Sequence, residues 1–146
     1  MKHDIETTED VQLLVDTFYN KVRDHEALGY IFDDIAKVNW EKHLPVMYSF
    51  WETVLFGKAG FKGNPMAKHM ALNNVTPLTE AHFAAWLVIW HQTIDDLFEG
   101  HMAQSAKSKA ELMKIMMLSK MQRLNTSNTD IPITAHPVSG VNMQPA

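Results

Sequence analysis

The chain contains no cysteine among its 146 residues. This absence excludes disulfides, thiolate-bound zinc and iron–sulfur clusters, because all of them need cysteine sulfur. Glycine and proline are scarce, with six of each, and the glycines match neither the phosphate loop nor the dinucleotide-binding motif. No apolar run approaches the about 18 residues of a transmembrane helix. We therefore expect a fold held together by an apolar core.

A surplus of positive charge is also missing. The 13 Lys and Arg residues are outnumbered by 17 Asp and Glu, which gives a net charge of -4 and a pI near 6.0. Such a balance offers no electrostatic reason to bind nucleic acid or an anionic membrane. The first residues, Met1 to Asp4, lead into acidic residues without the apolar stretch of a secretory signal. We expect a cytoplasmic protein with neither nucleic acid nor membrane as a partner.

The pattern that is present is helical. Apolar residues make up 46% of the chain, and they recur at the three- and four-residue spacing of amphipathic helices. Four stretches show this spacing clearly: 11–22, 40–54, 76–97 and 106–124. Strand-like alternation and Asn-Gly or Asp-Gly hairpin signals are absent. The sequence predicts one all-α domain over residues 1–124 and a disordered, polar tail over residues 125–146.

Several residues predict where these helices begin and end. Thr7 and Thr8 precede two acidic residues, and either could cap the first helix. Thr76 followed by Pro77 predicts the start of the third long helix. Between the first two helices, Gly29 and the pair Asp33-Asp34 indicate turns within a short apolar patch.

Two histidines are the strongest candidates for chemistry. His69 follows a glycine-punctuated loop and lies in a short segment that begins at Pro65, whereas His43 lies on the apolar face of the 40–54 helix. Two imidazoles across an apolar gap suggest a flat, iron-bearing cofactor, because haem iron takes histidine as an axial ligand. Spacing alone does not decide, since a single histidine on an apolar face is more often a hydrogen-bonded core residue.

The residue spacings that are typical of other metal sites do not occur in this sequence. Two histidines four residues apart, as in a helical zinc pair, do not occur, and neither does the Glu-x-x-His of di-iron bundles. Pro45 lies within the helix of His43, where proline removes a backbone hydrogen bond. We therefore expect a kinked or mobile turn around His43.

Taken together, several segments resemble the third group of the truncated haemoglobins over roughly residues 8–122. Found together in this order, the segments indicate the family far more specifically than any one of them alone. In chain order they are Phe18-Tyr19, Leu28-Gly29-Tyr30-Ile31-Phe32, Trp40-Glu41-Lys42-His43, Phe50-Trp51, the loop from Gly57 to His69 with Gly63-Asn64-Pro65, and Phe83-Ala84-Ala85-Trp86.

The resemblance implies a shortened globin in which two helices pack across two others around a pocket for haem b (iron protoporphyrin IX). His69 would be the proximal iron ligand. The polar residues of the distal side would be Tyr19, His43 and Trp86, and the apolar walls would be Phe32, Met47 and Trp51. Pro45 departs from the family pattern, and we interpret His43 as a movable gate.

The implied function is binding of dioxygen and other diatomic ligands at a pentacoordinate iron. A polar distal side favours oxygen or nitric oxide chemistry over bulk oxygen delivery. Nitric oxide dioxygenation and peroxidase-like activity are both compatible with it, and an enzymatic role would need a reductase partner. Two alternatives stay open: a haem sensor or scavenger with bis-histidine iron, and a haem-free helical interaction module.

Overall fold

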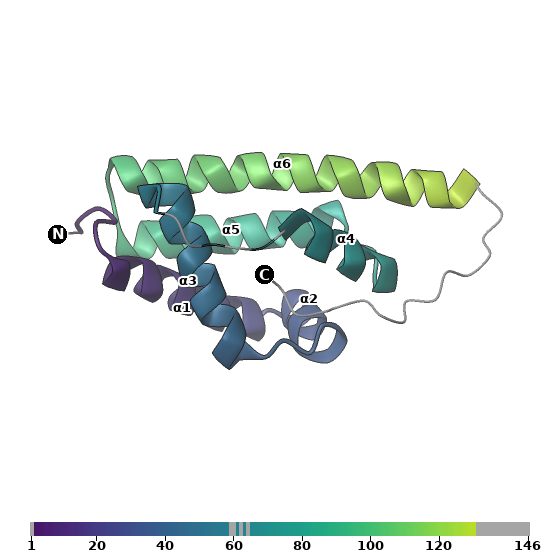
Figure 1. The fold of residues 1–146 in the computed structure, drawn as a ribbon, viewed down its shortest axis with the longest axis horizontal. Helices are drawn as coiled ribbons and strands as arrows, with labels where there is room; N and C mark the ends of the chain where they lie inside the picture. The colour runs from purple at the N-terminus through teal and green to yellow at the C-terminus, as the bar shows by residue number, and fades with distance from the viewer. Residues whose placement is uncertain (1, 59–60, 62, 64, 131–146) are drawn as a thin grey trace.

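The computed structural model describes residues 2–58, 61, 63 and 65–130, without the side chains of 65–67 and 124–130. Over these residues the chain is helical and contains no strand, which confirms the all-α prediction (Figure 1). The elements are α1 (Thr8–Asp24), α2 (Glu26–Gly29), the π-helix η1 (Tyr30–Ile35), α3 (Trp40–Phe56), α4 (Pro65–Val75), α5 (Glu80–Leu97) and α6 (His101–Asp130). Within this part of the chain, no helix has the length and apolar character needed to cross a bilayer.

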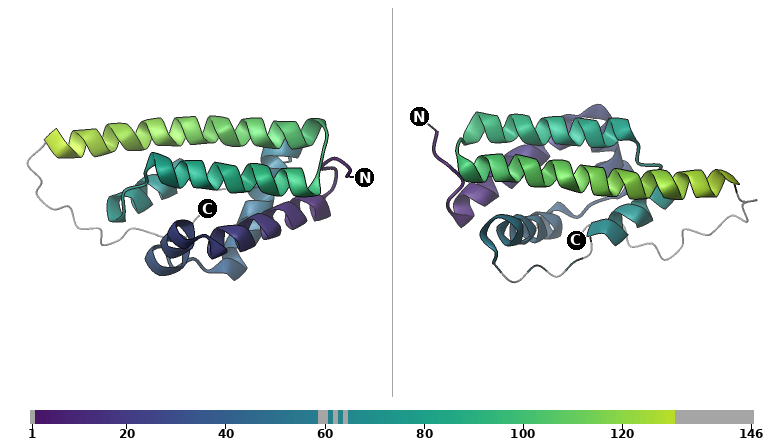
Figure 2. Two further views of the ribbon diagram at one scale, coloured as in Figure 1. Left: turned by 180° about the vertical axis from the view of Figure 1, so that it is seen from behind. Right: turned by 90° about the horizontal axis from the view of Figure 1, so that it is seen from above.

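The four long helices form two packed pairs. α5 and α6 run side by side (Figure 2), and α3 crosses α1 and extends toward the beginning of α6 (Figure 1). α1 also packs on α5, and the short α4 lies against α6. This is the two-over-two arrangement expected of a truncated globin.

Trp90 of α5 lies at the centre of the core and is fully buried. Its ring stacks on Trp51 of α3 with 4.4 Å between centroids, and Phe18 of α1 meets it edge-on at 4.9 Å. Its indole N–H donates to the Ala106 carbonyl of α6 over 3.2 Å. Because a buried indole needs a partner for its N–H, this one side chain joins all four long helices.

The helix starts confirm one prediction and correct another. Of the two predicted caps, Thr7 is the one that caps α1, and its hydroxyl accepts from the Asp10 N–H at 3.1 Å. The predicted start at Thr76 and Pro77 is wrong, because Thr79 caps α5 and the helix begins at Glu80. The reason is a side-chain contact: the backbone N–H of Leu78 donates to the Asn73 side chain of α4 at 2.8 Å, which holds this segment outside the helix.

The turns predicted around Gly29 and Asp33-Asp34 are wrong, because α2 and η1 form continuous helical backbone there. Gly29 is needed for close approach instead: a Cβ at this position would lie 2.4 Å from the Arg23 carbonyl oxygen. Single π-helical turns are frequent at functional sites, and η1 carries Ile31 and Phe32, which line the pocket described below.

The last helix, α6, is longer than predicted at both ends, from His101 to Asp130. It continues beyond the predicted domain boundary after Leu124, and residues 131–146 of the predicted tail lie outside the described residues.

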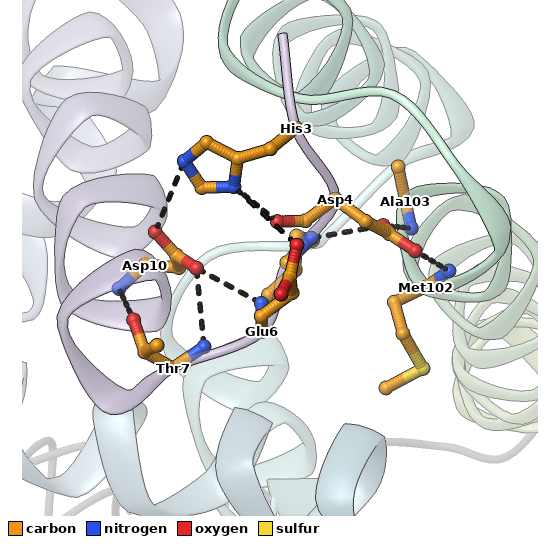
Figure 3. Close-up of polar contacts among 8 residues, drawn as sticks. His3, Asp4, Glu6, Thr7, Asp10, Met102 and Ala103 are labelled. Atoms are coloured by element: carbon orange, nitrogen blue, oxygen red, sulfur yellow. Dashed lines mark hydrogen bonds and ion pairs between the residues drawn. The ribbon is translucent and has the colours of Figure 1, made fainter.

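The N-terminus of α6 is capped by Asp4, which is distant in sequence (Figure 3). The two carboxylate oxygens accept from the backbone N–H groups of Met102 and Ala103, each at 2.8 Å. Burial alone would raise the pKa of Asp4, but these hydrogen bonds, together with one from the Ile5 N–H, outweigh it and lower the pKa. Figure 3 also shows a capping contact at the start of α1, where the Asp10 carboxylate accepts a hydrogen bond from the Thr7 backbone N–H at 3.1 Å.

We predict that Asp4→Ala destabilises the protein at neutral pH by about 1 kcal/mol, the usual cost of losing a cap. Since the pKa is lowered by folding, the carboxylate stabilises the fold above its ordinary pKa of 3.8 and stops doing so as the pH falls through the lowered value. Urea unfolding at several pH values measures this difference. Asp34→Ala, which removes an exposed carboxylate, is the control, and equal losses in both variants would contradict the prediction.

Candidate functional site

A pocket opens between the helices, and we call it the central pocket. The space free of protein atoms within it and at its mouth, part of it open solvent, is about 980 Å³. Its lining is mainly apolar and aromatic. All seven residues singled out by the sequence line it: Tyr19, Phe32, His43, Met47, Trp51, His69 and Trp86.

His69 is carried by α4, which begins at Pro65 as the sequence predicted. The same helix contributes Met70 and Leu72 to a small apolar cluster with Phe83 of α5 and Met121 of α6. These contacts hold α4 against the two long helices. His69 is therefore presented from a packed helix and not from the preceding glycine-containing loop.

Three different helices deliver the polar residues predicted for the distal side. Tyr19 comes from α1, His43 from α3 and Trp86 from α5. The rings of Tyr19 and His43 meet edge-on with 5.1 Å between centroids, and both side chains are more than nine-tenths buried. Phe18 links the group, because its ring lies 4.9 Å from Tyr19 and 6.0 Å from Trp86.

Two side chains that carry hydrogen-bond donors line this pocket without an acceptor among the described residues. Within the described part of the chain, neither the Tyr19 hydroxyl nor the Trp86 indole N–H forms a hydrogen bond. Burial raises the pKa of Tyr19 well above its ordinary 10.0, so the phenol keeps its proton at physiological pH. A buried donor without an acceptor costs stability. Tyr19 is buried and Trp86 is partly buried, and both side chains are suited to a ligand that accepts hydrogen bonds.

The helix around His43 continues through Pro45 without a break. The kinked or mobile turn expected there stays a prediction. The His43 N–H donates to the Asn39 carbonyl at 2.8 Å, which closes the first turn of α3. The ring of Trp40 packs edge-on against His43 with 5.4 Å between centroids. Whether His43 moves as a gate stays a prediction.

A cluster that holds this turn in place was not predicted from the sequence, because it has no local signal there. The Trp40 indole N–H donates to Asp33 of η1 at 3.0 Å, and Arg23 of α1 lies 3.5 Å from the same carboxylate. The Arg23 guanidinium also stacks over the Trp40 ring, 4.8 Å from its centroid. These three residues join α1, η1 and α3 beside the distal side of the pocket.

Sequence reasoning also missed two polar residues of the lining, His82 and Lys114. The Nδ1 atom of His82 accepts from the Thr79 N–H at 3.1 Å. A neutral ring with an accepting Nδ1 carries its proton on Nε2. It could bind iron through Nε2 only as an imidazolate, so His69 is the better iron ligand of the two.

Helices packed two over two around this pocket define a truncated globin. The crystal structure of a group III truncated hemoglobin from Campylobacter jejuni superposes with a TM-score of 0.74, over 83% of this chain and 95% of that one, at 23% identity. This match confirms the predicted fold.

The resemblance to the third group of truncated haemoglobins is also confirmed. The chain is 26% identical over 116 residues to the group 3 truncated hemoglobin ctb of Campylobacter jejuni, and the match covers 77% of this chain and 89% of the relative. No protein-family model matches the chain.

The buried phenol of Tyr19 makes a testable prediction. In an alkaline titration followed by phenolate absorbance, the difference between wild type and Tyr19→Phe should appear only well above pH 10.0, because burial raises the pKa of Tyr19. In strong denaturant the same difference should return to about the ordinary tyrosine pKa of 10. A difference near pH 10 in the native protein would show that the hydroxyl is solvated.

Proposed function

We propose that this protein binds haem b in the central pocket, with His69 as the proximal iron ligand, and that it binds dioxygen and other small diatomic ligands. One observation carries the proposal: His69 and the donors of Tyr19 and Trp86 line the same apolar pocket. The relative is named as a hemoglobin, which supports the same conclusion.

The residues of the pocket fit the cofactor. A porphyrin is a large, flat and mostly apolar ring, and Phe32, Met47 and Trp51 offer it an apolar wall. The iron needs one neutral imidazole from the protein, and His69 supplies it. When bound, haem contributes an iron that takes up diatomic gases reversibly.

The distal residues would act by donating hydrogen bonds. A diatomic ligand that draws electron density from iron carries partial negative charge, and Tyr19 and Trp86 each have a free proton to offer it. A hydrogen bond to a charged group contributes about 1.5–3 kcal/mol. Each bond would therefore slow ligand release by about 10- to 150-fold.

Slow release favours chemistry on the ligand over delivery of oxygen. We propose that the protein serves oxygen or nitric oxide chemistry, such as nitric oxide dioxygenation or a peroxidase-like reaction. Either enzymatic role needs electrons from a reductase partner. His43 packs between Tyr19 and Trp40, which favours a wall of the distal side over a second iron ligand. The iron would then be pentacoordinate before a gas binds.

We predict that His69→Ala abolishes stable haem binding, because it removes the proposed iron ligand. Absorption spectra of purified wild type and variant, after expression with haem supplied, measure the loss of the Soret band. His91→Ala, which changes a histidine paired with Glu111 outside the pocket, should keep the band.

Two spectra would contradict parts of the proposal. A wild-type protein without a Soret band would exclude haem binding and favour the haem-free module. Sharply split visible bands in the ferrous wild type without gas would instead indicate His43 as a sixth ligand, as in the sensor or scavenger alternative.

We predict that Tyr19→Phe keeps haem and releases oxygen about 10- to 150-fold faster, because one hydrogen bond of about 1.5–3 kcal/mol is lost. Stopped-flow measurement of oxygen dissociation tests this. Tyr30→Phe is the matched control, since Tyr30 is 54% exposed and does not line the pocket. An unchanged rate in Tyr19→Phe would rule out its proposed role.

A further inference from the structure

The lining of the central pocket contains one permanent charge, that of Lys114. The residue lies on α6 between Met113 and Met117, which line the same pocket. Lys114 is half-buried, and its ammonium forms no hydrogen bond or ion pair with any other described residue. By contrast, Lys21 of α1 is paired with Asp96 over 3.0 Å. An unpaired cation at an apolar pocket indicates an anionic partner.

His82 offers a second donor from the first turn of α5. Because its Nδ1 accepts from the Thr79 N–H, the proton of the neutral ring lies on Nε2. The ring is held by this hydrogen bond, and the partial positive charge of a helix N-terminus favours an anion near it. α5 and α6 pack directly on each other, so neighbouring helices supply both donors.

Among the residues that the structure describes, no carboxylate side chain lines the pocket, so these donors have no acidic competitor from that part of the chain. Haem has an apolar ring with two carboxylate groups on one edge. A carboxylate loses much solvation on entering a protein unless a cation or hydrogen-bond donor replaces the water.

We infer that Lys114, with the Nε2–H of His82 as a second donor, binds the propionate carboxylates of haem. The inference rests on the proposed function and adds to it, because it assigns the direction in which the ring enters the pocket. The carboxylate edge meets α6 and the first turn of α5, and the apolar edge goes toward the aromatic walls.

The experiment compares haem with its dimethyl ester, in which both carboxylates are neutral. Each is loaded into wild type, Lys114→Met and Lys109→Met, and its transfer to an excess of a haem-scavenging apoglobin is timed. Met keeps the apolar stem of lysine and removes the charge. Lys109 is exposed on the same helix and does not line the pocket, which makes Lys109→Met the matched control.

With haem, Lys114→Met should lose the cofactor roughly 2- to 10-fold faster than wild type, the range for a partly solvated charge pair. The difference should shrink at high salt, because salt screens such pairs. Lys114→Arg should restore slow loss. His82→Asn, whose amide oxygen can keep the bond to Thr79, should lose haem faster by a smaller factor. With the dimethyl ester, every variant should match wild type.

Equal haem loss in wild type and Lys114→Met would overturn the inference while leaving haem binding intact. Equal acceleration with haem and with the ester would also overturn it, since the effect would then arise from packing. A wild type that retains neither compound would overturn the proposed function and this inference together. Circular dichroism of each variant identifies misfolding, and Lys114→Gln then replaces a variant that fails to fold.

Discussion

The burial of Trp90 is the interaction on which the rest of this structure depends. Its ring stacks on Trp51 and contacts Phe18 edge-on, and its indole N–H donates a hydrogen bond to the Ala106 carbonyl. These contacts fix the relative positions of α1, α3, α5 and α6. Trp86 lies one helical turn away on α5 and parallel to Trp90, with 6.5 Å between centroids. The core thereby sets the direction of a side chain that faces the pocket.

The pocket combines an apolar lining with polar side chains that need hydrogen-bond acceptors. An apolar lining favours a flat organic cofactor, whereas the buried donor of Tyr19 and the partly buried donor of Trp86 have no acceptor among the described residues. A buried donor without an acceptor costs stability. At two helix starts, by contrast, the carboxylates of Asp4 and Asp10 accept hydrogen bonds from backbone N–H groups. We interpret the unpaired donors of the pocket as available to a ligand, and a ligand that pairs with them stabilises the fold.

Local signals in the sequence predicted local structure well. The periodicity of α1 and α3 and the cap at Thr7 depend on neighbours within about one helical turn, and these predictions are confirmed. The start at Thr76 was wrong because Asn73 of another helix holds the Leu78 N–H. The turn at Gly29 was wrong because the glycine serves a close approach to α1. Both errors arise from contacts that lie only five or six residues apart in the sequence but that the spacing of apolar residues does not reveal.

The sequence by itself determined the helical class, the positions of the main helices and the set of residue types that the pocket needs. That Tyr19, His43, His69 and Trp86 share a pocket was predicted from a resemblance, and the packing of four separate helices brings them to it. Only the tertiary structure decided that Lys114 and His82 line this pocket and that Arg23, Asp33 and Trp40 hold its edge. The physical reason is range: helix formation depends on residues a few positions apart, whereas the environment of a side chain depends on elements that meet only when the chain folds.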